Sequence, residues 1–387
     1  MPESTKSLKL NPSTEFCWLR TGEDALEQML AAIRSARRLV CLEMYIVYSS
    51  PIAEKFRQAL VDACQRGVVV KVLVDALGSM SLPDSFWSAL RTAGGQFRWF
   101  NPLRLNRLGL RDHRKILVCD DTIAFIGGFN ISTEYQGDGV HSGWRDLGMK
   151  ICGSFTRQLH EAFDEMFAMA DMRQLRFARL RKSKFQKTVS ISEGQLLLTA
   201  PGRQNPLKQA LRRDLHKAKD VRIICAYFLP PWSLRRDFAR VVKRGGRVQL
   251  ILPAKSDVPL SQFAGQSLYR RMLQNGIEIF EYQPQILHAK LIVIDGIVYA
   301  GSANLDARSF QLNYELALRL PDENVGAGAR AIFAEVQQHC LPIRLVEWRK
   351  SRSLWTRIRQ RWAYFILARL DPYLTRRQLR ALRNATT

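Results

Sequence analysis

Apolar and polar positions follow the same order in the two halves of the chain. Apolar residues at every third or fourth position predict helices, and the short apolar runs between them predict buried strands. In the first half we predict helices over residues 23–37, 52–65 and 83–93 and strands over 39–46, 68–75 and 96–100. In the second half the corresponding helices cover 205–219, 233–243 and 260–275, and the strands cover 221–229, 247–252 and 277–282.

Strands that alternate with helices in this way are typical of α/β proteins. The repeated unit is far longer than the units of solenoid proteins, so it indicates a duplicated domain. We predict two pseudo-symmetric domains, each a mixed β-sheet flanked by helices, over residues 1–188 and 189–341. The first range ends in a basic stretch, 173–187, that is either a solvated linker or a strip facing phosphates or a membrane. Residues 342–387 form a separate segment.

The net charge of the chain limits the classes of partner that it is expected to bind. Its 59 Lys and Arg outnumber 35 Asp and Glu, which leaves a net charge of +24 and favours nucleic acid or an anionic membrane surface. The seven cysteines are odd in number and contain no C-x-x-C pair, so we expect neither a disulfide framework nor a zinc site. We also expect no secretory signal and no membrane-spanning segment, because no apolar run reaches about 18 residues.

Each half carries one copy of the same motif, in which a His and a Lys two positions apart precede an apolar strand, an Asp, a small-residue turn and an Asn. The first copy consists of His113, Lys115, Asp120 and Asn130. The second copy consists of His288, Lys290, Asp295, Ser302 and Asn304. Asp295-Gly296 predicts a two-residue hairpin turn, and the turn after Asp120 is expected to be one residue longer. On a strand the His and the Lys point to one face.

These residue types suit phosphodiester chemistry. One histidine can attack phosphorus, and a second can protonate the leaving alcohol and deprotonate the incoming one. Two lysines offer positive charge to the phosphate oxygens, and the Asn amides and the turn around Ser302 offer hydrogen-bond donors. The paired aspartates complete the catalytic motif, but we expect Asp120 and Asp295 to hold the strand ends and the domain contact rather than touch substrate. We predict no metal and no cofactor.

A catalytic histidine also needs an acid that orients it. The candidates, which could also contact substrate, are Asp146, downstream of the first motif, and Glu315, downstream of the second. The glycine-rich loop 136–143 could lie over the site, and its His141 is expected to be exposed or otherwise satisfied rather than a substrate contact. The remaining histidines, His160, His216 and His339, lie in helical patterns and are interpreted as ordinary residues.

With these motifs the chain resembles the phospholipase D superfamily, which is defined by duplicated H-x-K-x-x-x-x-D motifs, over roughly residues 15–341. Within it, the chain resembles bacterial cardiolipin synthases of the short form without N-terminal membrane spans. The supporting segments include Phe125–Asn130, Trp144–Asp146, Gly301–Phe310, Asn313–Glu315, Glu43 with Tyr45, and Tyr227–Pro230.

The resemblance implies an active site at the interface of the two domains and a covalent phosphatidyl-histidine. It assigns His113 as the nucleophile and His288 as the acid and then the base. It further implies that phosphatidylglycerol is converted into cardiolipin and glycerol. The second-half segment that begins Pro201-Gly202-Arg203 is short for this family, which leaves the acceptor open.

Three other functions stay open at this point. A hydrolytic phospholipase D shares every catalytic residue and differs only in using water as the acceptor. A nuclease of the superfamily would use the positive charge to bind DNA, although a fused repeat is less typical of such enzymes. A non-catalytic lipid-binding scaffold is disfavoured because both motifs are intact.

Residues 342–387 hold twelve Arg and Lys against two acidic residues, and Trp348, Trp355 and Trp362 recur every seven positions. Leu354, Ile358, Phe365 and Ile366 extend an apolar stripe beside them. This pattern is typical of an amphipathic helix in a lipid interface, ended by Asp371-Pro372, although the tryptophans could instead pack on the protein. We therefore predict a peripheral protein on the cytoplasmic face of the bacterial membrane that binds anionic phospholipid, with nucleic acid an unlikely partner.

Overall fold

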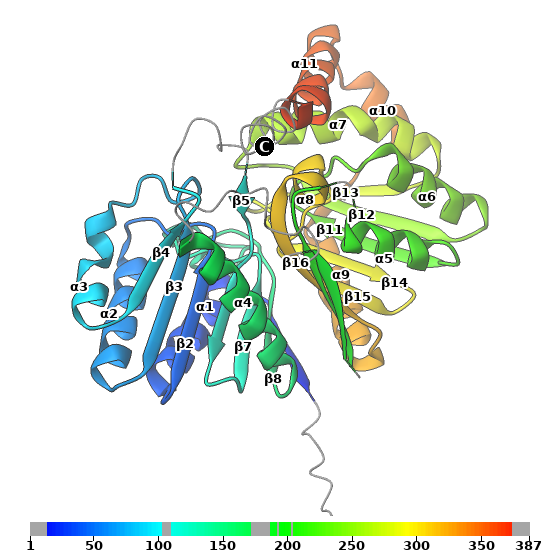
Figure 1. Cartoon of the computed structure of the whole chain (residues 1–387). Helices are drawn as coiled ribbons and strands as arrows, with labels where there is room; N and C mark the ends of the chain where they lie inside the picture. Colours follow the sequence, from blue (N-terminus) through cyan, green and yellow to red (C-terminus); the bar gives the residue numbers. More distant parts are fainter. Residues whose placement is uncertain (1–13, 103–109, 172–185, 192, 203, 374–387) are drawn as a thin grey trace, which may run out of the picture.

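The structure is a computed structural model that describes residues 14–102, 110–171, 186–191, 193–202 and 204–373. Most of the basic stretch 173–187 lies outside the described residues, as does Arg203. Two β-sheets lie side by side, one built mainly from each half of the chain (Figure 1). The predicted α/β architecture of two similar units is therefore confirmed.

The first sheet has seven strands. In spatial order they are β1 (Glu15–Leu19), β8 (Gly148–Cys152), β7 (Ile123–Gly127), β6 (Ile116–Cys119), β2 (Leu39–Met44), β3 (Val69–Asp75) and β4 (Gln96–Phe100). Among the hydrogen-bonded neighbours in the described part of this sheet, β2 with β3 and β3 with β4 are parallel, and the other pairs are antiparallel. The helices of this half are α1 (Gly22–Ser35), α2 (Pro51–Gln65), α3 (Ser88–Thr92) and α4 (Phe155–Asp171).

The second sheet has ten strands. Its main path is β17 (Cys340–Pro342), β13 (Glu278–Tyr282), β12 (Arg247–Pro253), β11 (Asp220–Cys225), β14 (Lys290–Ile294), β15 (Ile297–Gly301), β16 (Asn313–Leu320), β10 (Gly194–Thr199) and β9 (Lys187–Ile191). The strand β5 (Arg111–Asp112) comes from the first half but pairs with β16. The helices are α5 (Pro206–Leu215), α6 (Trp232–Lys243), α7 (Pro259–Gln274), α8 (Ala307–Gln311), α9 (Glu323–Gln338), α10 (Leu345–Lys350) and α11 (Leu354–Phe365).

The buried apolar residues of the described part of the chain form three clusters. One covers the face of the first sheet that packs on α1 and α2, and another covers the face of the second sheet that packs on α5, α6 and α7. The third cluster contains residues of both sheets together with α4 and α9. The two halves therefore share one continuous core, which fixes their relative position.

The hairpin turns of the two motifs differ in length, as the sequence predicts. Asp295 and Gly296 have φ values of 48° and 93°, which a two-residue turn of the hairpin type requires. Residues 120–122 form the longer turn, and Asp120 and Asp121 have φ values of 55° and 58°. Both turns close antiparallel strand pairs, β6 with β7 and β14 with β15.

The aspartates of the motifs hold these turns. Asp120 accepts hydrogen bonds from the backbone N–H groups of Arg37, Arg38 and Leu39 at 2.8–2.9 Å, where α1 leads into β2. Burial alone would raise the pKa of Asp120, but these amides hold it below its ordinary value. Asp295 accepts from the corresponding amides of Lys219 and Asp220 at 2.7–3.1 Å. Each aspartate thus ties a strand end within its own half, and neither bridges the halves.

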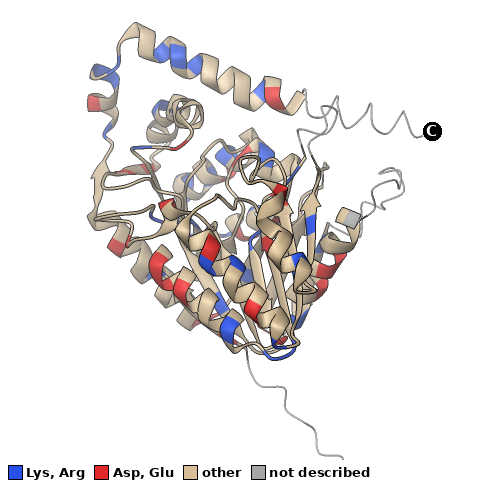
Figure 2. Ribbon diagram, turned by 90° about the vertical axis from the view of Figure 1, so that its left-hand side faces the viewer, with Lys and Arg blue, Asp and Glu red and all other residues tan. Residues whose placement is uncertain are grey.

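The C-terminal segment departs from the single helix expected there. α10 ends at Lys350, and Ser353 begins α11 by accepting a hydrogen bond from the N–H of Thr356. After α11 the chain continues as a π-helical turn, η5 (Ile366–Leu370), and remains helical over 371–373, so Asp371-Pro372 does not end it. Figure 2 shows basic residues along this long helix beside the body of the protein. Within the described ranges, no helix combines the length and the apolar content needed to cross a membrane.

Candidate active site

A cavity of about 420 Å³ opens between the two halves, and His113 and His288 both line it. The other lining residues that the argument uses are Tyr45, Arg111, Asn130, Tyr135, Trp144, Tyr227, Asn304 and Arg308. Both histidine side chains are more than 90% buried. The two motifs, which are 175 positions apart in the sequence, therefore face one shared cavity.

Each histidine is held by the opposite half of the chain. The N–H of His113 donates to the carbonyl of Tyr314 at 3.0 Å, and its ring Nδ1 lies 3.0 Å from Oε2 of Glu315. The N–H of His288 donates to the carbonyl of Arg145 at 2.8 Å, and its Nδ1 lies 2.6 Å from Oδ2 of Asp146. The sequence suggests an acid downstream of each histidine, whereas in the structure each acid serves the histidine of the other motif.

The contact between each carboxylate and Nδ1 determines which nitrogen of the histidine ring carries the proton. A carboxylate at Nδ1 keeps the proton on that nitrogen, which leaves the lone pair on Nε2. Because the acids lie behind the rings, Glu315 and Asp146 do not line the cavity. From this position they can orient the histidines, and the substrate contact considered for them stays a prediction.

The Glu315 carboxylate is enclosed by hydrogen-bond donors. Besides His113, it accepts from Ser302 Oγ at 2.6 Å, Ser309 Oγ at 2.8 Å and Asn313 Nδ2 at 3.2 Å. Burial would raise the pKa of Glu315, but His113, Ser302 and the charge of Lys115 hold it below its ordinary value, so it is ionised. Ser302 bonds Glu315 and does not line the cavity, so the substrate contact predicted for it stays a prediction.

Both histidines are weaker bases than a free imidazole. Burial lowers the pKa of His113 to about 4, and the charge of Lys115 adds to this effect against the opposing Glu315. Burial and Lys290 likewise lower the pKa of His288, against Asp146. A neutral imidazole with a free Nε2 is the form that can attack phosphorus.

The two motif lysines are buried behind the rings. Lys115 Nζ donates to the carbonyl of His113 at 2.7 Å, and Lys290 Nζ donates to the carbonyl of His288. Burial, followed by the charge of Lys290, lowers the pKa of Lys115 to about 7. Neither lysine lines the cavity, but Lys290 Nζ also lies 2.8 Å from Nδ1 and 3.2 Å from Nε2 of His288, beside the nitrogen that faces substrate. The phosphate contact expected of the lysines stays a prediction.

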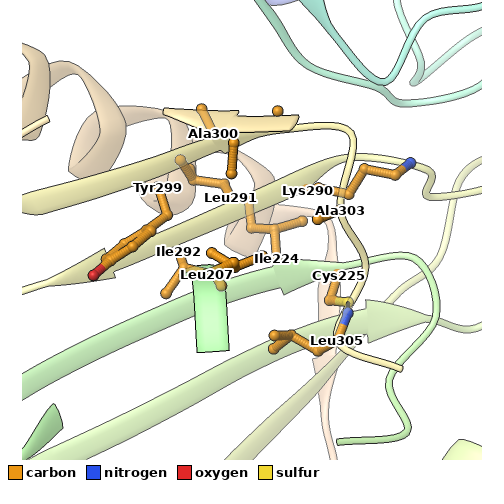
Figure 3. Close-up of a pocket in the computed structure, with 12 residues that line it drawn as sticks. Leu207, Ile224, Cys225, Lys290, Leu291, Ile292, Tyr299, Ala300, Ala303 and Leu305 are labelled. Atoms are coloured by element: carbon orange, nitrogen blue, oxygen red, sulfur yellow. Dashed lines mark hydrogen bonds between the residues drawn. The ribbon is translucent and has the colours of Figure 1, made fainter. Parts of the chain in front are cut away.

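Lys290 also borders a second, much smaller space of about 20 Å³ inside the second half. Figure 3 shows the side chains that line it, among them Leu207, Ile224 and Cys225. This space has room for about one water molecule and is mostly apolar, so it belongs to the core rather than to a substrate site.

Both motif asparagines line the cavity. Asn130 Oδ1 accepts from the N–H of Ile46 at 3.2 Å, and its Nδ2 donates to the hydroxyl of Tyr135 at 2.7 Å. Asn304 Oδ1 accepts from the N–H of Tyr227 at 3.4 Å. Its Nδ2 has no protein partner among the described residues, so Asn304 keeps a donor for substrate.

Aromatic rings surround the histidines. The ring of Tyr45 lies 4.7 Å from that of His113, while Tyr135, Trp144 and Tyr227 lie 5.6, 5.7 and 6.1 Å from His288. These rings exclude water and make the site less polar, which strengthens the electrostatic contacts inside it. Tyr135 belongs to none of the motifs visible in the sequence, whereas Tyr45, Trp144 and Tyr227 lie in segments that carry the family resemblance.

The glycine-rich loop 136–143 does not line the cavity. It is fastened to the second half, because the hydroxyl of Tyr282 donates to the carbonyl of Gly139 and Gln285 Nε2 donates to that of His141 at 3.1 Å. His141 itself is 88% exposed in its side chain and pairs with Asp138, in agreement with the ordinary role expected for it.

One group of possible metal ligands was not visible in the sequence. Cys41, His160 and Asp164 bring their ligand atoms within 4.8 Å of one another, away from the cavity. His160 already pairs with Asp121 at 2.6 Å, and Asp164 pairs with Lys71 at 2.9 Å. Since His160 and Asp164 already take part in ion pairs, we interpret the group as an ionic network.

The comparisons with known sequences indicate one family. A family model described as "Cardiolipin synthase, PLD-like domain" matches residues 29–166 and 211–337. Cardiolipin synthase 1 of Bacillus cereus is 30% identical over 355 residues, which cover 88% of this chain and 69% of that protein. The cardiolipin synthase of Geobacillus kaustophilus is 32% identical over 311 residues, covering 77% and 61%. The probable cardiolipin synthase YwiE of Bacillus subtilis is 28% identical over 341 residues, covering 86% and 67%.

The chain thus spans about two thirds of the length of these curated relatives. Among solved structures, the phosphatidylserine synthase of Haemophilus influenzae Rd KW20 superposes with a TM-score of 0.70 over 96% of this chain and 94% of that one. At 15% sequence identity this similarity concerns the fold.

Proposed function

The chain belongs to the cardiolipin synthase family of phospholipase D-like proteins, and on this basis we propose that it transfers a phosphatidyl group between two phosphatidylglycerol molecules. The products are cardiolipin and glycerol. The observation that carries the proposal is the pair of buried histidines facing one cavity, each held at Nδ1 by a carboxylate of the opposite half.

In the first step, Nε2 of His113 attacks the phosphorus of one phosphatidylglycerol. The bond from phosphorus to the glycerol oxygen breaks, and a protonated His288 gives its proton to that oxygen, so glycerol leaves. Binding of the anionic phosphodiester favours the protonated form of His288, and Asp146 at Nδ1 stabilises it. The phosphatidyl group is then bonded to His113.

In the second step, His288 removes the proton from a hydroxyl group of the second phosphatidylglycerol. The oxygen attacks phosphorus, the bond between phosphorus and His113 breaks, and cardiolipin forms. Phosphoryl transfer places negative charge on the non-bridging oxygens, and the donor on Asn304 and the positive charges near the cavity stabilise it. Glu315 balances the positive charge that the His113 ring carries while it is bonded to phosphorus.

We further propose that the protein lies on an anionic membrane surface, at its cytoplasmic face. On α11, the residues Leu354, Trp355, Trp362 and Phe365 are 72%, 78%, 62% and 51% exposed. Tryptophan among arginines suits the headgroup region of a bilayer. The opposite face of the helix packs on the protein, where Ala363 is buried and Gln360 bonds Gln266 at 3.1 Å. The seven cysteines are free thiols, the state that a reducing cytoplasm maintains.

Trp348 takes no part in this surface. Its ring packs 4.8 Å from the ring of Tyr269 on α7, and the guanidinium of Arg352 lies 3.9 Å from its centre. The regular spacing of the three tryptophans therefore serves two purposes: Trp348 anchors the segment to the body, and Trp355 and Trp362 are available to lipid.

The decisive experiment is incubation with vesicles of isotope-labelled phosphatidylglycerol and identification of the product by mass spectrometry. We expect cardiolipin and glycerol, and no turnover by His113→Ala or His288→Ala. Phosphatidic acid as the sole product would mean hydrolysis. No lipid turnover, together with cleavage of DNA in a parallel incubation, would mean a nuclease. Substantial activity in either histidine variant would refute the shared site.

The membrane surface is tested separately by vesicle sedimentation. Changing Trp355 and Trp362 to Ser should weaken binding to phosphatidylglycerol vesicles roughly tenfold or more, because two large apolar groups lose their lipid contact. A matched control is Val69→Ser, which removes an exposed apolar side chain from the start of β3. Equal binding by the tryptophan variant and the parent chain would contradict this orientation.

A further inference from the structure

Two guanidinium groups line the cavity in addition to the residues of the two motifs. Arg111 lies on β5, two positions before His113, and Arg308 lies on α8 of the second half. Arg111 Nη1 donates to the hydroxyl of Tyr45 at 3.1 Å. Arg308 Nη2 donates to Oδ1 of Asp371 at 2.6 Å.

Each guanidinium is only partly hydrogen-bonded by the protein. Nε of Arg111 and Nη1 of Arg308 are buried without a hydrogen-bond partner among the described residues. Arg111 also forms no ion pair within the described part of the chain. A buried N–H without a partner is unfavourable, and a charged one calls for an anion. The contact between Arg308 and the carboxylate of Asp371 is an example of an anionic group bound on this side of the cavity.

Tyr45 separates Arg111 from the reacting centre. Its ring packs against the ring of His113 at 4.7 Å, while its hydroxyl, at the far end of the side chain, contacts Arg111. The guanidinium therefore contacts the hydroxyl end of Tyr45, whereas His113 contacts the ring. A phosphate at Nε2 of His113 and a phosphate at Arg111 are two different positions.

The proposed reaction involves two phosphates, which lie at different positions in the site. The acceptor phosphatidylglycerol carries a phosphodiester of its own, joined by a three-carbon glycerol bridge to the hydroxyl that attacks. We propose that Arg111 and Arg308 form a second anion subsite, which holds this non-reacting phosphate of the acceptor lipid. The subsite rests on the proposed function and adds to it a reason why a phospholipid competes with water as the acceptor.

During transfer, the subsite changes no bond. The acceptor hydroxyl forms the new bond to phosphorus, its proton goes to the free histidine, and the bond between phosphorus and the other histidine breaks. Guanidinium groups bind phosphate oxygens through paired N–H donors, which lysine cannot reproduce. Recognition should therefore depend on the shape of the group as well as on its charge.

The test compares two isotope-labelled soluble acceptors with unlabelled phosphatidylglycerol as the donor: glycerol 3-phosphate, which carries the second phosphate, and glycerol, which does not. Incorporation of the label into lipid measures the transfer to each acceptor. We expect the parent chain to prefer glycerol 3-phosphate about tenfold or more in kcat/KM, the effect of a charge-assisted contact. Arg111→Gln should bring this preference toward unity, and Arg111→Lys should restore it only in part.

Arg308 needs a compensated variant, because its loss would leave Asp371 unpaired. Arg308→Gln combined with Asp371→Asn removes both charges together, and the preference should again fall. Arg157→Gln is the matched control for net charge, since Arg157 is 78% exposed in its side chain and does not line the cavity. Thermal unfolding of each variant verifies that it is folded.

The outcomes separate the alternatives. A parent chain without preference for glycerol 3-phosphate would overturn the subsite. A variant in which kcat/KM falls equally for both acceptors, and in which the phosphatidyl-histidine also forms more slowly, would overturn the subsite too. The arginines would then bind the reacting phosphate. If the parent only hydrolyses lipid, the proposed function fails, but the subsite still predicts that glycerol 3-phosphate inhibits hydrolysis in the parent and not in the double variant. The absence of such inhibition would refute it.

Discussion

The crossed contact between Glu315 and His113 leads to a specific prediction for Glu315→Gln. The substitution keeps the size of the side chain and removes its charge. Glu315 accepts from the His113 ring, two serine hydroxyls and the Asn313 amide. The amide group of Gln would have to direct its own N–H groups toward some of these donors, so His113 loses both its negative partner and part of its support.

The expected loss follows from that contact. A hydrogen bond to a charged group contributes about 1.5–3 kcal/mol, which corresponds to roughly ten- to hundredfold in rate. The carboxylate also stabilises the positive ring that forms when Nε2 bonds phosphorus. We therefore expect formation of the phosphatidyl-histidine to slow by about a hundred- to a thousandfold.

Asp146→Asn is the matched partner, because Asp146 makes the equivalent contact with His288. The two variants differ in their response to the leaving group. A phosphodiester with an aryl leaving group needs no proton from His288, so Asp146→Asn should regain most of its rate with this substrate. Glu315→Gln should stay slow, because its defect concerns the nucleophile.

A rapid-quench assay that follows release of the leaving group in a single turnover measures this step. Rescue of Glu315→Gln by the aryl substrate, with no rescue of Asp146→Asn, would mean that His288 attacks and His113 is the acid. A loss below threefold in Glu315→Gln, with unchanged unfolding, would refute the role of the crossed contact altogether.

Three further predictions concern pH, stability and metal ions. Because burial lowers the pKa of His113 to about 4, the neutral nucleophile persists well below pH 6.5, and the acid limb of single-turnover cleavage of the aryl substrate should lie near pH 4 to 5; a limb at 6.5 would contradict this. Asp295→Ala should lower the free energy of unfolding in urea by about 1–3 kcal/mol and leave kcat within about threefold, since Asp295 holds backbone amides outside the cavity, and a large kcat loss at unchanged stability would refute that role. EDTA should leave the rate unchanged, because side chains supply the nucleophile, the acid and the positive charge; inhibition that a divalent cation reverses would refute this.

The sequence predicts the elements whose pattern is strong. The central strands of both sheets are buried on both faces, so they stand out as apolar runs. Most helices between them lie close to the predicted ranges, but the helix predicted over 83–93 is a 3-10 turn at 84–87 followed by α3, and the helix predicted over 205–219 ends at Leu215. The edge strand β9 alternates between half-buried and exposed positions and gives no such run. The strand β5 has only two residues and exists because the second half offers β16 as its partner.

The site was predictable in its members and less so in their arrangement. The duplicated motif identifies His113 and His288, and the residue types predict their chemistry. Which acid orients which histidine depends on a contact between the halves, and spacing along the chain carries no information about it. The sequence also does not predict where the side chain of Lys115 points, because Lys115 bonds a backbone carbonyl, a group that every residue has.

The crossed contacts make the packing of the two halves part of the catalytic geometry. Tyr314 and Arg145 hold the backbones of the histidines, and the next residue along the chain in each case, Glu315 or Asp146, holds the ring. A small rotation of one half against the other would stretch both ring contacts at once. The core shared by the two sheets resists that rotation because it is densely packed and contains residues of both. A substitution in that core should therefore lower the rate through the two histidines before it unfolds the chain, since a displacement of about 1 Å in an active site is enough to cost activity.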